Sequence, residues 1–527
     1  MATSRHGSAV RGMDNVPHSS IRDQRFGRMF RYLPAADFPE AALVALADTI
    51  SHGEFAERIE AGVEVDTPLD QAEPADENPS IPSGYTYLGQ FIDHDITFDP
   101  MSSLDRFNDP DALQDFRTPR LDLDSVYGSG PDDQPFLYDS DGKHLLLGDD
   151  KDFDPRKARP DLPRNTADPR RALIGDKRND ENLIVSQLHA TFLRFHNRVL
   201  ETEAGDDFAL AQQIVRWHYQ WIVLHDFIPR IVGPATYQEV IGGRGGMPAH
   251  RCYDAKGRYA YIPVEFSVAA YRFGHSQVRP SYALNRIVRS ADPTEQAFGG
   301  KRAKFHRIPI FSLTDVTQKP LANLNGFREL PGFWAMDWAF FFDGLASDGE
   351  VPAGSIVPQP SYKIDTTLVD PLTSLPDRQS ETNRARRSLS ALNLLRGWRM
   401  GLPSGQSVAR KMGLDALSDD QLFDHADADR AAARQALLAE AKNRFADNCP
   451  LWFYILREAE LVADGVHLGQ VGGTIVAEVL SGLVMEDRFS FLAQWPNWRP
   501  TLPGATSGHF TMADLINFTN GTTVPTV

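Results

Sequence analysis

The feature that most constrains the fold is a pair of long amphipathic segments near the middle of the chain. Residues 182–203 and 208–228 carry apolar side chains at the spacing of one helix face, which predicts two packed α-helices. Pro229 is expected to end the second helix. Helices are also expected where the same spacing recurs, at 41–50, 84–98, 264–273, 389–399, 418–445, 451–461 and 471–484. The chain is therefore predicted to be mainly α, a large helical fold with long irregular loops and little β.

The 527 residues are enough for two to four domains by length alone. Residues 1–75 are polar and are expected to form a partly irregular N-terminal arm. No composition shift typical of an inter-domain linker follows residue 84. We therefore expect a single large domain over residues 76–527.

Charge and composition exclude several classes of partner. The net charge of −17 repels polyanions, so nucleic acid and anionic membranes are not expected partners. No stretch is apolar enough to span a bilayer, and no signal peptide is visible, so we expect a soluble protein that is cytoplasmic or exported without a visible signal. Cys252 and Cys449 allow one disulfide at most. The G-x-S-x-G, H-E-x-x-H and P-loop motifs are absent from the sequence.

The first segment that carries chemistry is Gln-Phe-Ile-Asp-His-Asp at residues 90–95. On a helix Gln90 and His94 are four residues apart and share a face, with Asp93 and Asp95 on either side of it. One helix turn could therefore present an imidazole to a pocket and carboxylates to its edges. Taken alone, the same residues are also typical of an acidic turn with a surface histidine.

A second segment, residues 118–124, alternates oxygen-bearing residues. Thr118, Asp122 and Asp124, with the carbonyl of Arg120, match the preference of hard cations for several closely spaced oxygen ligands. The spacing is not that of an EF-hand. In isolation an Asp-x-Asp loop is more often a solvated turn.

Six segments in order make the pattern specific. They are GQFIDHDITF, TPRLDLDSVYG, GDKRNDENLIVSQLHATFLRFHNRVL, AYRFGHSQVRP, LSALNLLRGWRMGLP and GQVGGTIVAEVLSGLVMEDRF. Together they resemble the animal-type haem peroxidases of the peroxidase–cyclooxygenase superfamily, over roughly residues 80–500. The chain is identified as a bacterial member of that family, with residues 76–527 as the haem peroxidase domain.

The resemblance implies roles on the distal side of a haem. His94 is implied as the distal base, Arg178 as its cationic partner, and Gln90 as a residue lining the distal pocket. Asp93 and Glu181 occupy the positions at which the family forms ester bonds to haem methyl groups. Asn182 stands where a methionine would form a third link, so that link is not expected.

The resemblance also implies the remaining ligands. His275 is expected to ligate the iron, Asn393 to hydrogen-bond its other ring nitrogen, and Arg272 and Arg396 to meet the haem propionates. The implied calcium ligands are Asp95, Thr118, Arg120 (by its carbonyl), Asp122 and Asp124. The expected cofactors are thus haem b, ester-linked if the bonds at Asp93 and Glu181 form, and calcium. His189, His196 and His218 are expected to be packed or capped rather than ligands.

The implied activity is peroxidation. Hydrogen peroxide would oxidise a small reducing substrate (halide, thiocyanate or phenol) through a ferryl intermediate. Fatty-acid dioxygenases and cyclooxygenases of the superfamily place a radical-forming tyrosine three residues before the proximal histidine. Here that residue is Arg272, and Tyr271 lies one step further back. A non-catalytic adhesion protein with a peroxidase-like fold is the other alternative.

Overall fold

The computed structural model describes residues 26–50, 75–99, 107–108, 115–150, 159–167, 170–242, 247–255, 260–285, 307–311, 323–332, 334–345, 358–375, 378, 381–505 and 508–521. Its α-helices are α1 (Glu40–Asp48), α3 (Gly84–Ile96), α4 (Asp124–Tyr127), α5 (Leu183–Thr202), α6 (Phe208–Ile222), α7 (Ile228–Val232), α8 (Pro234–Val240), α11 (Leu389–Arg399), α12 (Gly405–Lys411), α13 (Asp419–Phe423), α14 (Ala428–Ala439), α15 (Leu451–Ala463), α16 (Gln470–Glu486), α17 (Phe491–Gln494) and α18 (Met512–Thr519). The predicted mainly α architecture is confirmed.

Short elements complete the fold. The 3₁₀ turns are η4 (Pro135–Leu137), η5 (Lys177–Asp180), η8 (Ala270–His275), η9 (Trp338–Phe340), η10 (Asp370–Thr373), η12 (Arg384–Arg386) and η13 (Ala441–Asn443), and the π-turns are η6 (Val223–Phe227) and η7 (Glu265–Ala269). Two-residue strands pair as β1 (Phe26–Gly27) with β3 (Ile262–Pro263), in parallel, and β4 (Ser281–Tyr282) with β5 (Ile308–Pro309), antiparallel. The longer β2 (Glu77–Pro82) pairs antiparallel with β6 (Pro360–Tyr362) and leads into α3.

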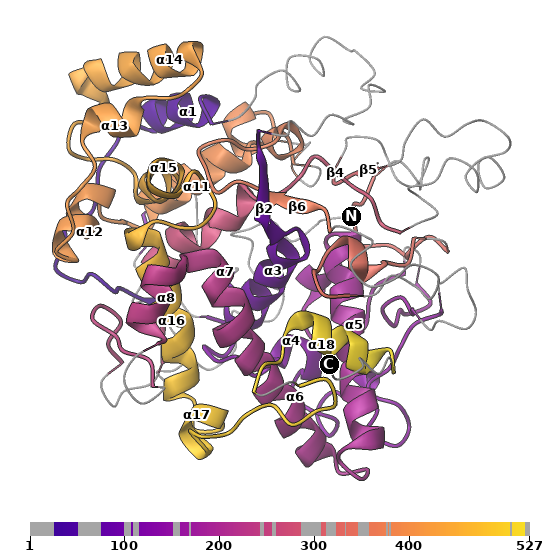
Figure 1. The fold of residues 1–527 in the computed structure, drawn as a ribbon. Coiled ribbons are helices and arrows are strands. Elements are labelled where there is room, and N and C mark those ends of the chain that lie inside the picture. The colour runs from indigo at the N-terminus through magenta and orange to yellow at the C-terminus, as the bar shows by residue number, and fades with distance from the viewer. Residues whose placement is uncertain are drawn as a thin grey trace, which may run out of the picture.

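Helix α3 lies at the centre of the molecule (Figure 1). It packs against α5, which in turn packs against α6 and α18. The ring of Phe91 on α3 stacks on that of Phe192 on α5, with the ring centroids 4.5 Å apart, and both rings are fully buried. Burial of such aromatic side chains contributes about 1.5–3 kcal/mol each. Helix α3, which carries Gln90 and His94, is therefore anchored by contacts in the hydrophobic core.

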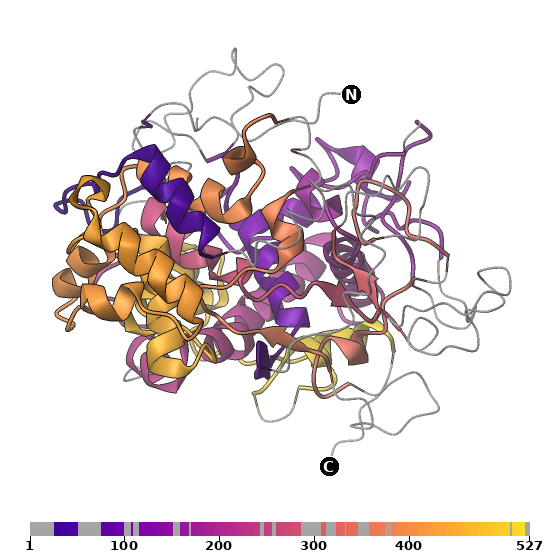
Figure 2. The ribbon, with the colours of Figure 1, turned by 90° about the horizontal axis from the view of Figure 1, so that it is seen from above.

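Helices from distant parts of the chain pack against one another around α1. Helix α1, near the start of the described chain, packs against α11 and α14 (Figures 1 and 2). The expected division into an arm of residues 1–75 and a domain of residues 76–527 stays a prediction, and residues 1–25 and 51–74 lie outside the described residues.

Several predicted helix boundaries were wrong. Pro229 does not end the helix, because the π-turn η6 precedes it and Pro229 sits in the first turn of α7, where its missing N–H costs no intrahelical bond. The segment 418–445 is split into α13 and α14, because Asp427 caps α14 by accepting from the backbone of Arg430. The segment 264–273 is a π-turn followed by a 3₁₀ turn rather than an α-helix. Ser418 is the N-cap of α13, in a capping box with Gln421.

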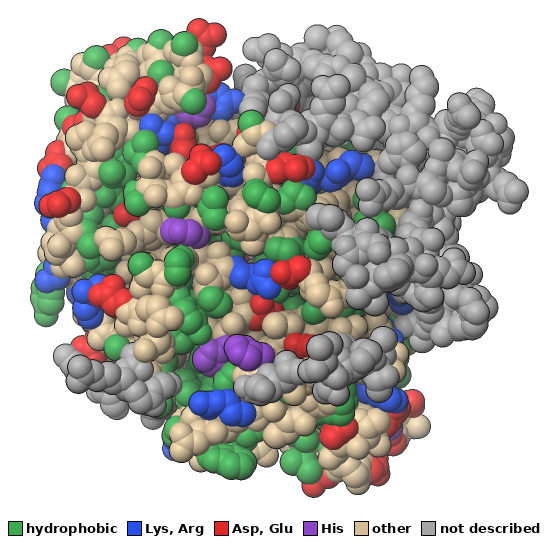
Figure 3. Space-filling model, viewed as in Figure 1, with side chains coloured by type: hydrophobic (Ala, Val, Ile, Leu, Met, Phe, Trp, Pro, Cys, Tyr) green, Lys and Arg blue, Asp and Glu red, His purple; other side chains and the backbone are tan. Residues whose placement is uncertain are grey.

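The described surface carries charges of both signs. On the described part of the face shown in Figure 3, acidic and basic side chains are interspersed and form no extended basic patch. Among the described residues, no helix combines the length and apolar character that crossing a bilayer requires. Cys252 and Cys449 are both free thiols, so the disulfide that the sequence left open is not formed.

Candidate functional site

His94 lies in the last turn of α3 and is 4% exposed. Its Nδ1 lies 2.8 Å from Oδ1 of Asn179. Burial, together with the positive charge of Arg178, lowers the pKa of His94 to about 4. The ring is therefore neutral at pH 7. Its Nε2 is 3.9 Å from Oε1 of Glu181, too far for a hydrogen bond, so the lone pair on Nε2 is available.

Arg178 lies on η5, which follows the N-cap Asp176. Its Nη2 donates to Asp176 at 2.7 Å and to the carbonyl oxygens of His94 and Thr97 at 3.0 and 2.5 Å. Burial opposes the charge on Arg178, but Asp176 outweighs it and the pKa is raised. The guanidinium is thus a fixed cation at the C-terminal end of α3, where it also complements the helix dipole.

Gln90 joins α3 to the residues that follow η5. Its Nε2 donates to Oε1 of Glu181, and its Oε1 accepts from Nδ2 of Asn182 at 3.0 Å. Asn182 also caps α5 by accepting from the backbone of Val185. Both ends of the Gln90 amide are therefore satisfied, which fixes its orientation beside His94.

Asp93 faces the opposite side of the site. Its Oδ1 accepts from the hydroxyl of Thr97 at 3.1 Å, and its Oδ2 lies 3.9 Å from Nη1 of Arg272. Burial opposes ionisation, but Arg272 and Arg178 outweigh it, so the pKa of Asp93 is lowered. Asp93 is also among the charges that act on His275. It is therefore a common neighbour of the two predicted halves of the site.

His275 ends η8, and Asn393 of α11 reaches it. Nδ2 of Asn393 lies 2.8 Å from Nδ1 of His275. In this orientation Nδ2 donates to Nδ1 and the ring proton lies on Nε2. A half-turn of the carboxamide would place its oxygen there instead, where it would accept from Nδ1–H and leave the lone pair of His275 on Nε2. Burial and the charge of Arg272 lower the pKa of His275 to about 3, so the ring is neutral.

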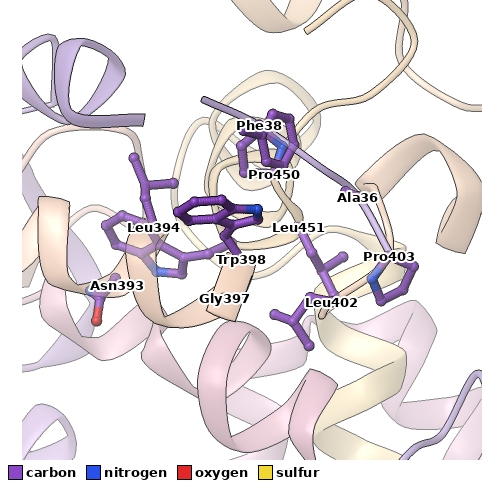
Figure 4. Close-up of a pocket in the computed structure, with 11 residues that line it drawn as sticks. Ala36, Phe38, Asn393, Leu394, Gly397, Trp398, Leu402, Pro403, Pro450 and Leu451 are labelled. Atoms are coloured by element: carbon purple, nitrogen blue, oxygen red, sulfur yellow. The ribbon is translucent and has the colours of Figure 1, made fainter. Parts of the chain in front are cut away.

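Apolar packing holds Asn393 in place. A small pocket behind it is lined by Phe38, Leu394, Trp398, Leu402, Pro450 and Leu451 (Figure 4). Trp452 of α15 donates its indole N–H to the backbone carbonyl of Arg272 at 3.2 Å, which ties η8 to the same helices. The orientation of His275 therefore depends on α11 and α15 together.

Arg272 and Arg396 lie on the same side of the site as Asp93. Nε of Arg272 donates to the carbonyl of Ser267 at 2.9 Å, and Nη2 of Arg396 donates to Asp99 at 2.7 Å. The Nε atom of Arg396 is buried and makes no hydrogen bond within the described part of the chain. A buried guanidinium N–H without an acceptor is costly, and a carboxylate of a bound group would satisfy it. Together with a neutral His275, this donor set fits a haem.

The predicted cation ligands come together from two segments. Carboxylate oxygens of Asp95, Asp122 and Asp124 lie within 4.8 Å of one another. The hydroxyl of Thr118 donates to Asp122 at 2.9 Å. Burial and the other two carboxylates raise the pKa of Asp95 well above its ordinary value. A hard cation would relieve this crowding, so the oxygen set fits calcium.

The backbone of this loop is shaped for the cluster. Leu123, between two of the acids, has a left-handed conformation with φ of 59°. Its N–H donates to Asp95 at 3.2 Å. Arg120 lies in the same loop, with its N–H bonded to the carbonyl of Thr118 at 2.7 Å. A residue held at positive φ is strained, and here the strain turns the loop toward α3.

Arg117 connects the cation site to the distal side. It lies 2.8 Å from Asp176 and 3.3 Å from Asp124. Asp176 is therefore shared by Arg117 and Arg178, whose charges outweigh burial and lower its pKa. The pairs form one continuous path from Asp124 to the guanidinium beside His94.

Four residues around the site were not predicted from the sequence: Asn179, Asp176, Arg117 and Asp99. Asn179 and Asp176 stand next to or near Arg178 in the recognised motif, but their roles depend on partners far along the chain. His196 and His218 are packed, as expected. His189 is fully buried too, but its Nδ1 accepts a hydrogen bond from Nδ2 of Asn179 at 2.9 Å, so it belongs to the distal network.

Comparisons with known proteins point to one family. The animal haem peroxidase family model matches residues 105–329, which include Asp122, Asp124, Arg178, Glu181 and His275. The sequence is 25% identical over 391 residues to thyroid peroxidase of Mus musculus, covering 70% of this chain and 38% of that protein. This chain thus spans well under half the length of the curated relatives that it matches.

Solved structures share the fold. Peroxidase A from Dictyostelium discoideum superimposes with a TM-score of 0.57 at 16% identity, covering 95% of this chain and 92% of that one. The fatty acid α-dioxygenase of Oryza sativa superimposes with a TM-score of 0.52 at 15% identity, covering 84% and 73%.

Proposed function

This chain belongs to the animal haem peroxidase family, and we propose that it is a haem-dependent peroxidase that uses hydrogen peroxide to oxidise a small donor such as a halide, thiocyanate or a phenol. The observation that carries the proposal is the distal arrangement. A buried His94 has its Nδ1 engaged by Asn179 and its Nε2 free of hydrogen bonds among the described residues, and it lies beside the fixed guanidinium of Arg178.

His275 would ligate the haem iron through Nε2, with Asn393 orienting the ring from behind. Arg272 and Arg396 would bind the propionates, and the unsatisfied Nε of Arg396 would find its acceptor there. When bound, the haem would supply the two electrons that reduce hydrogen peroxide and would later recover them from the donor.

The chain's own contribution is the movement and stabilisation of charge. Nε2 of His94 accepts a proton from hydrogen peroxide and returns it to the departing oxygen, which leaves as water. The guanidinium of Arg178 opposes the negative charge that builds on that oxygen, and it cannot lose its own proton. Because Asp176 and two backbone carbonyls already hold Arg178, no reorganisation is needed during the step.

Asp93 and Glu181 are proposed to form ester bonds to haem methyl groups. Each ester bond would replace a methyl C–H bond in a two-electron oxidation, for which hydrogen peroxide would be the oxidant and would be reduced to water. Asp93 lies 3.9 Å from Nη1 of Arg272, and Glu181 accepts a hydrogen bond from Nε2 of Gln90. The lowered pKa of Asp93 keeps it as a carboxylate. Calcium is proposed to bind Asp95, Thr118, the carbonyl of Arg120, Asp122 and Asp124, and so to fix the end of α3 next to His94.

A fatty-acid dioxygenase is the second candidate, because solved α-dioxygenases share the fold. The described site favours a peroxidase. Tyr271 is buried, with its ring stacked on Phe266 at 4.6 Å, and its hydroxyl has no hydrogen-bond partner within the described part of the chain. Arg272, rather than a tyrosine, stands three residues before His275.

The test begins with an absorbance spectrum of the purified protein after haem loading. A Soret band, and a change in it on adding peroxide, are expected. Stopped-flow mixing should then show turnover with bromide, thiocyanate or guaiacol and no oxygen uptake with palmitate. A His94→Gln variant should keep haem and lose at least about 100-fold in the rate with peroxide. The matched control is His196→Gln, which removes a buried histidine on a different helix, α5. A chain that binds no haem would refute the proposal, and oxygen uptake with palmitate would establish the dioxygenase instead.

A further inference from the structure

The carboxamide of Asn179 lies between two buried histidine rings. Its Oδ1 is 2.8 Å from Nδ1 of His94, and its Nδ2 is 2.9 Å from Nδ1 of His189. Asn179 and His189 are fully buried and His94 is 4% exposed. Water therefore does not compete for these hydrogen bonds.

A carboxamide has one accepting end and one donating end. With Oδ1 facing His94, the proton of the neutral ring must lie on Nδ1, and the lone pair must lie on Nε2. With Nδ2 facing His189, Nδ1 of that ring must accept, so its proton lies on Nε2. The two rings cannot choose their tautomers independently, because a half-turn of the amide would reverse both.

Only one of the two arrangements suits a base at Nε2 of His94. If the amide were reversed, Nδ1 of His94 would accept and Nε2 would carry the proton, leaving it unable to take another. We propose that Asn179 is a positioning residue that fixes the tautomer of His94, through a carboxamide shared with His189. The inference rests on the proposed function for its catalytic meaning, but the tautomer coupling itself does not.

The position of Asn179 supports this role. It lies on η5, whose N-cap Asp176 and last residue Asp180 are both held by arginines from outside the turn, Arg117 and Arg164. The backbone that presents the amide is therefore anchored at both ends. His189 approaches from α5, a separate element, and its Nε2 has no hydrogen-bond partner among the described residues. The amide is thus the polar group that relates this ring to His94.

Two variants separate the ends of the amide. Asn179→Asp keeps an acceptor for Nδ1–H of His94 but removes the donor to His189. Asn179→Ala removes both. His189→Gln tests the far end, and His196→Gln controls for loss of a buried histidine on the same helix.

The first measurement is the ring ¹⁵N chemical shifts of the histidines in the full chain without haem, assigned by the variants. The wild type should show His94 protonated at Nδ1 and His189 at Nε2. Asn179→Ala should give a mixed tautomer at His94, and Asn179→Asp should keep the Nδ1–H form. The second measurement is the rate with peroxide after haem loading, which should fall about 10- to 100-fold in Asn179→Ala and by less in Asn179→Asp.

The outcomes separate the two proposals. An unchanged His94 tautomer in Asn179→Ala would overturn the inference, and so would a changed tautomer with a wild-type rate. If the wild-type chain binds no haem or does not react with peroxide, the proposed function fails, while the ¹⁵N shifts still decide whether Asn179 couples the two rings. If Asn179→Ala does not fold, His189→Gln decides: a His94 tautomer that stays wholly Nδ1–H would show that the far ring has no part in fixing it.

Discussion

Removing Arg164 should destabilise the protein far more than removing a neighbouring surface arginine. Arg164 bonds Asp161 through Nε at 2.9 Å and Asp180 through Nη1 and Nη2 at 2.8 Å each. The side chains of Arg164, Asp161 and Asp180 are 4%, 2% and 3% exposed. An Arg164→Met variant keeps most of the volume and leaves two buried carboxylates without their cation.

The expected loss of stability depends on which hydrogen-bond donors each carboxylate retains without Arg164. Asp161 retains the backbone N–H groups of Leu162 and Leu330 as donors, whereas the carboxylate of Asp180 is held by Arg164 itself. Removing one partner of a buried pair costs about 3–5 kcal/mol, so we expect a loss of about 4 kcal/mol for Arg164→Met. Arg170, six residues on, pairs with Glu329 at the surface, with side chains 53% and 41% exposed. Arg170→Met should cost about 0–1 kcal/mol.

The assay is urea unfolding followed by tryptophan fluorescence and circular dichroism. The pH dependence gives a second check. Burial raises the pKa of Asp180 to about 6 even with Arg164 present, and it should be higher in Arg164→Met. The wild type therefore carries the Asp180 charge above about pH 6 and the variant only at higher pH, so the loss should grow as the pH rises above 6. As the pH falls through 6, Asp180 becomes protonated in both proteins and the difference should narrow. Equal losses for Arg164→Met and Arg170→Met, or a gap that widens in acid, would refute the reasoning.

Three further predictions concern the cofactor and the cation. His275→Ala should lose the Soret band or its iron ligation, whereas unchanged spectra after haem loading would contradict the ligand assignment. Calcium at 100 times its Kd should raise the free energy of unfolding by about 2.7 kcal/mol, measured by urea titration with calcium and with a chelator. In Asp95→Asn this gain in stability should largely disappear. An undiminished gain in the variant would place the cation elsewhere. After turnover with peroxide, acid acetone should leave haem attached to the protein, and Asp93→Asn combined with Glu181→Gln should release it; complete extraction from the wild type would exclude the esters.

Local patterns predicted the elements whose boundaries depend on their own residues. Helix α11 spans the expected residues 389–399, and Gln90 and His94 share a face of α3 as their spacing required. The acids of the cation site were also predicted, although Asp95 and Asp122 come from separate segments. Here a recognised motif order supplied the long-range information that periodicity lacks.

The predictions failed where a competing local signal or a distant partner decides the outcome. The apolar spacing predicted one helix over 418–445, but the side chain of Asp427 caps a second helix within that segment. The role of Asn179 could not be predicted, because it depends on hydrogen bonds to His94, 85 residues before it, and to His189, 10 residues after it. Such hydrogen-bond partners are set by tertiary packing and leave no periodic trace.

The sharing of Asp176 between Arg117 and Arg178 has a thermodynamic consequence. Arg117 also contacts Asp124, so the charge state of the acid cluster bears on the guanidinium beside His94. Coupling free energy is reciprocal. If a cation at the acid cluster changes the affinity of the pocket beside His94 for a ligand, that ligand should change the affinity of the cluster for the cation by the same factor. The concentration of the metal ion would then regulate substrate binding.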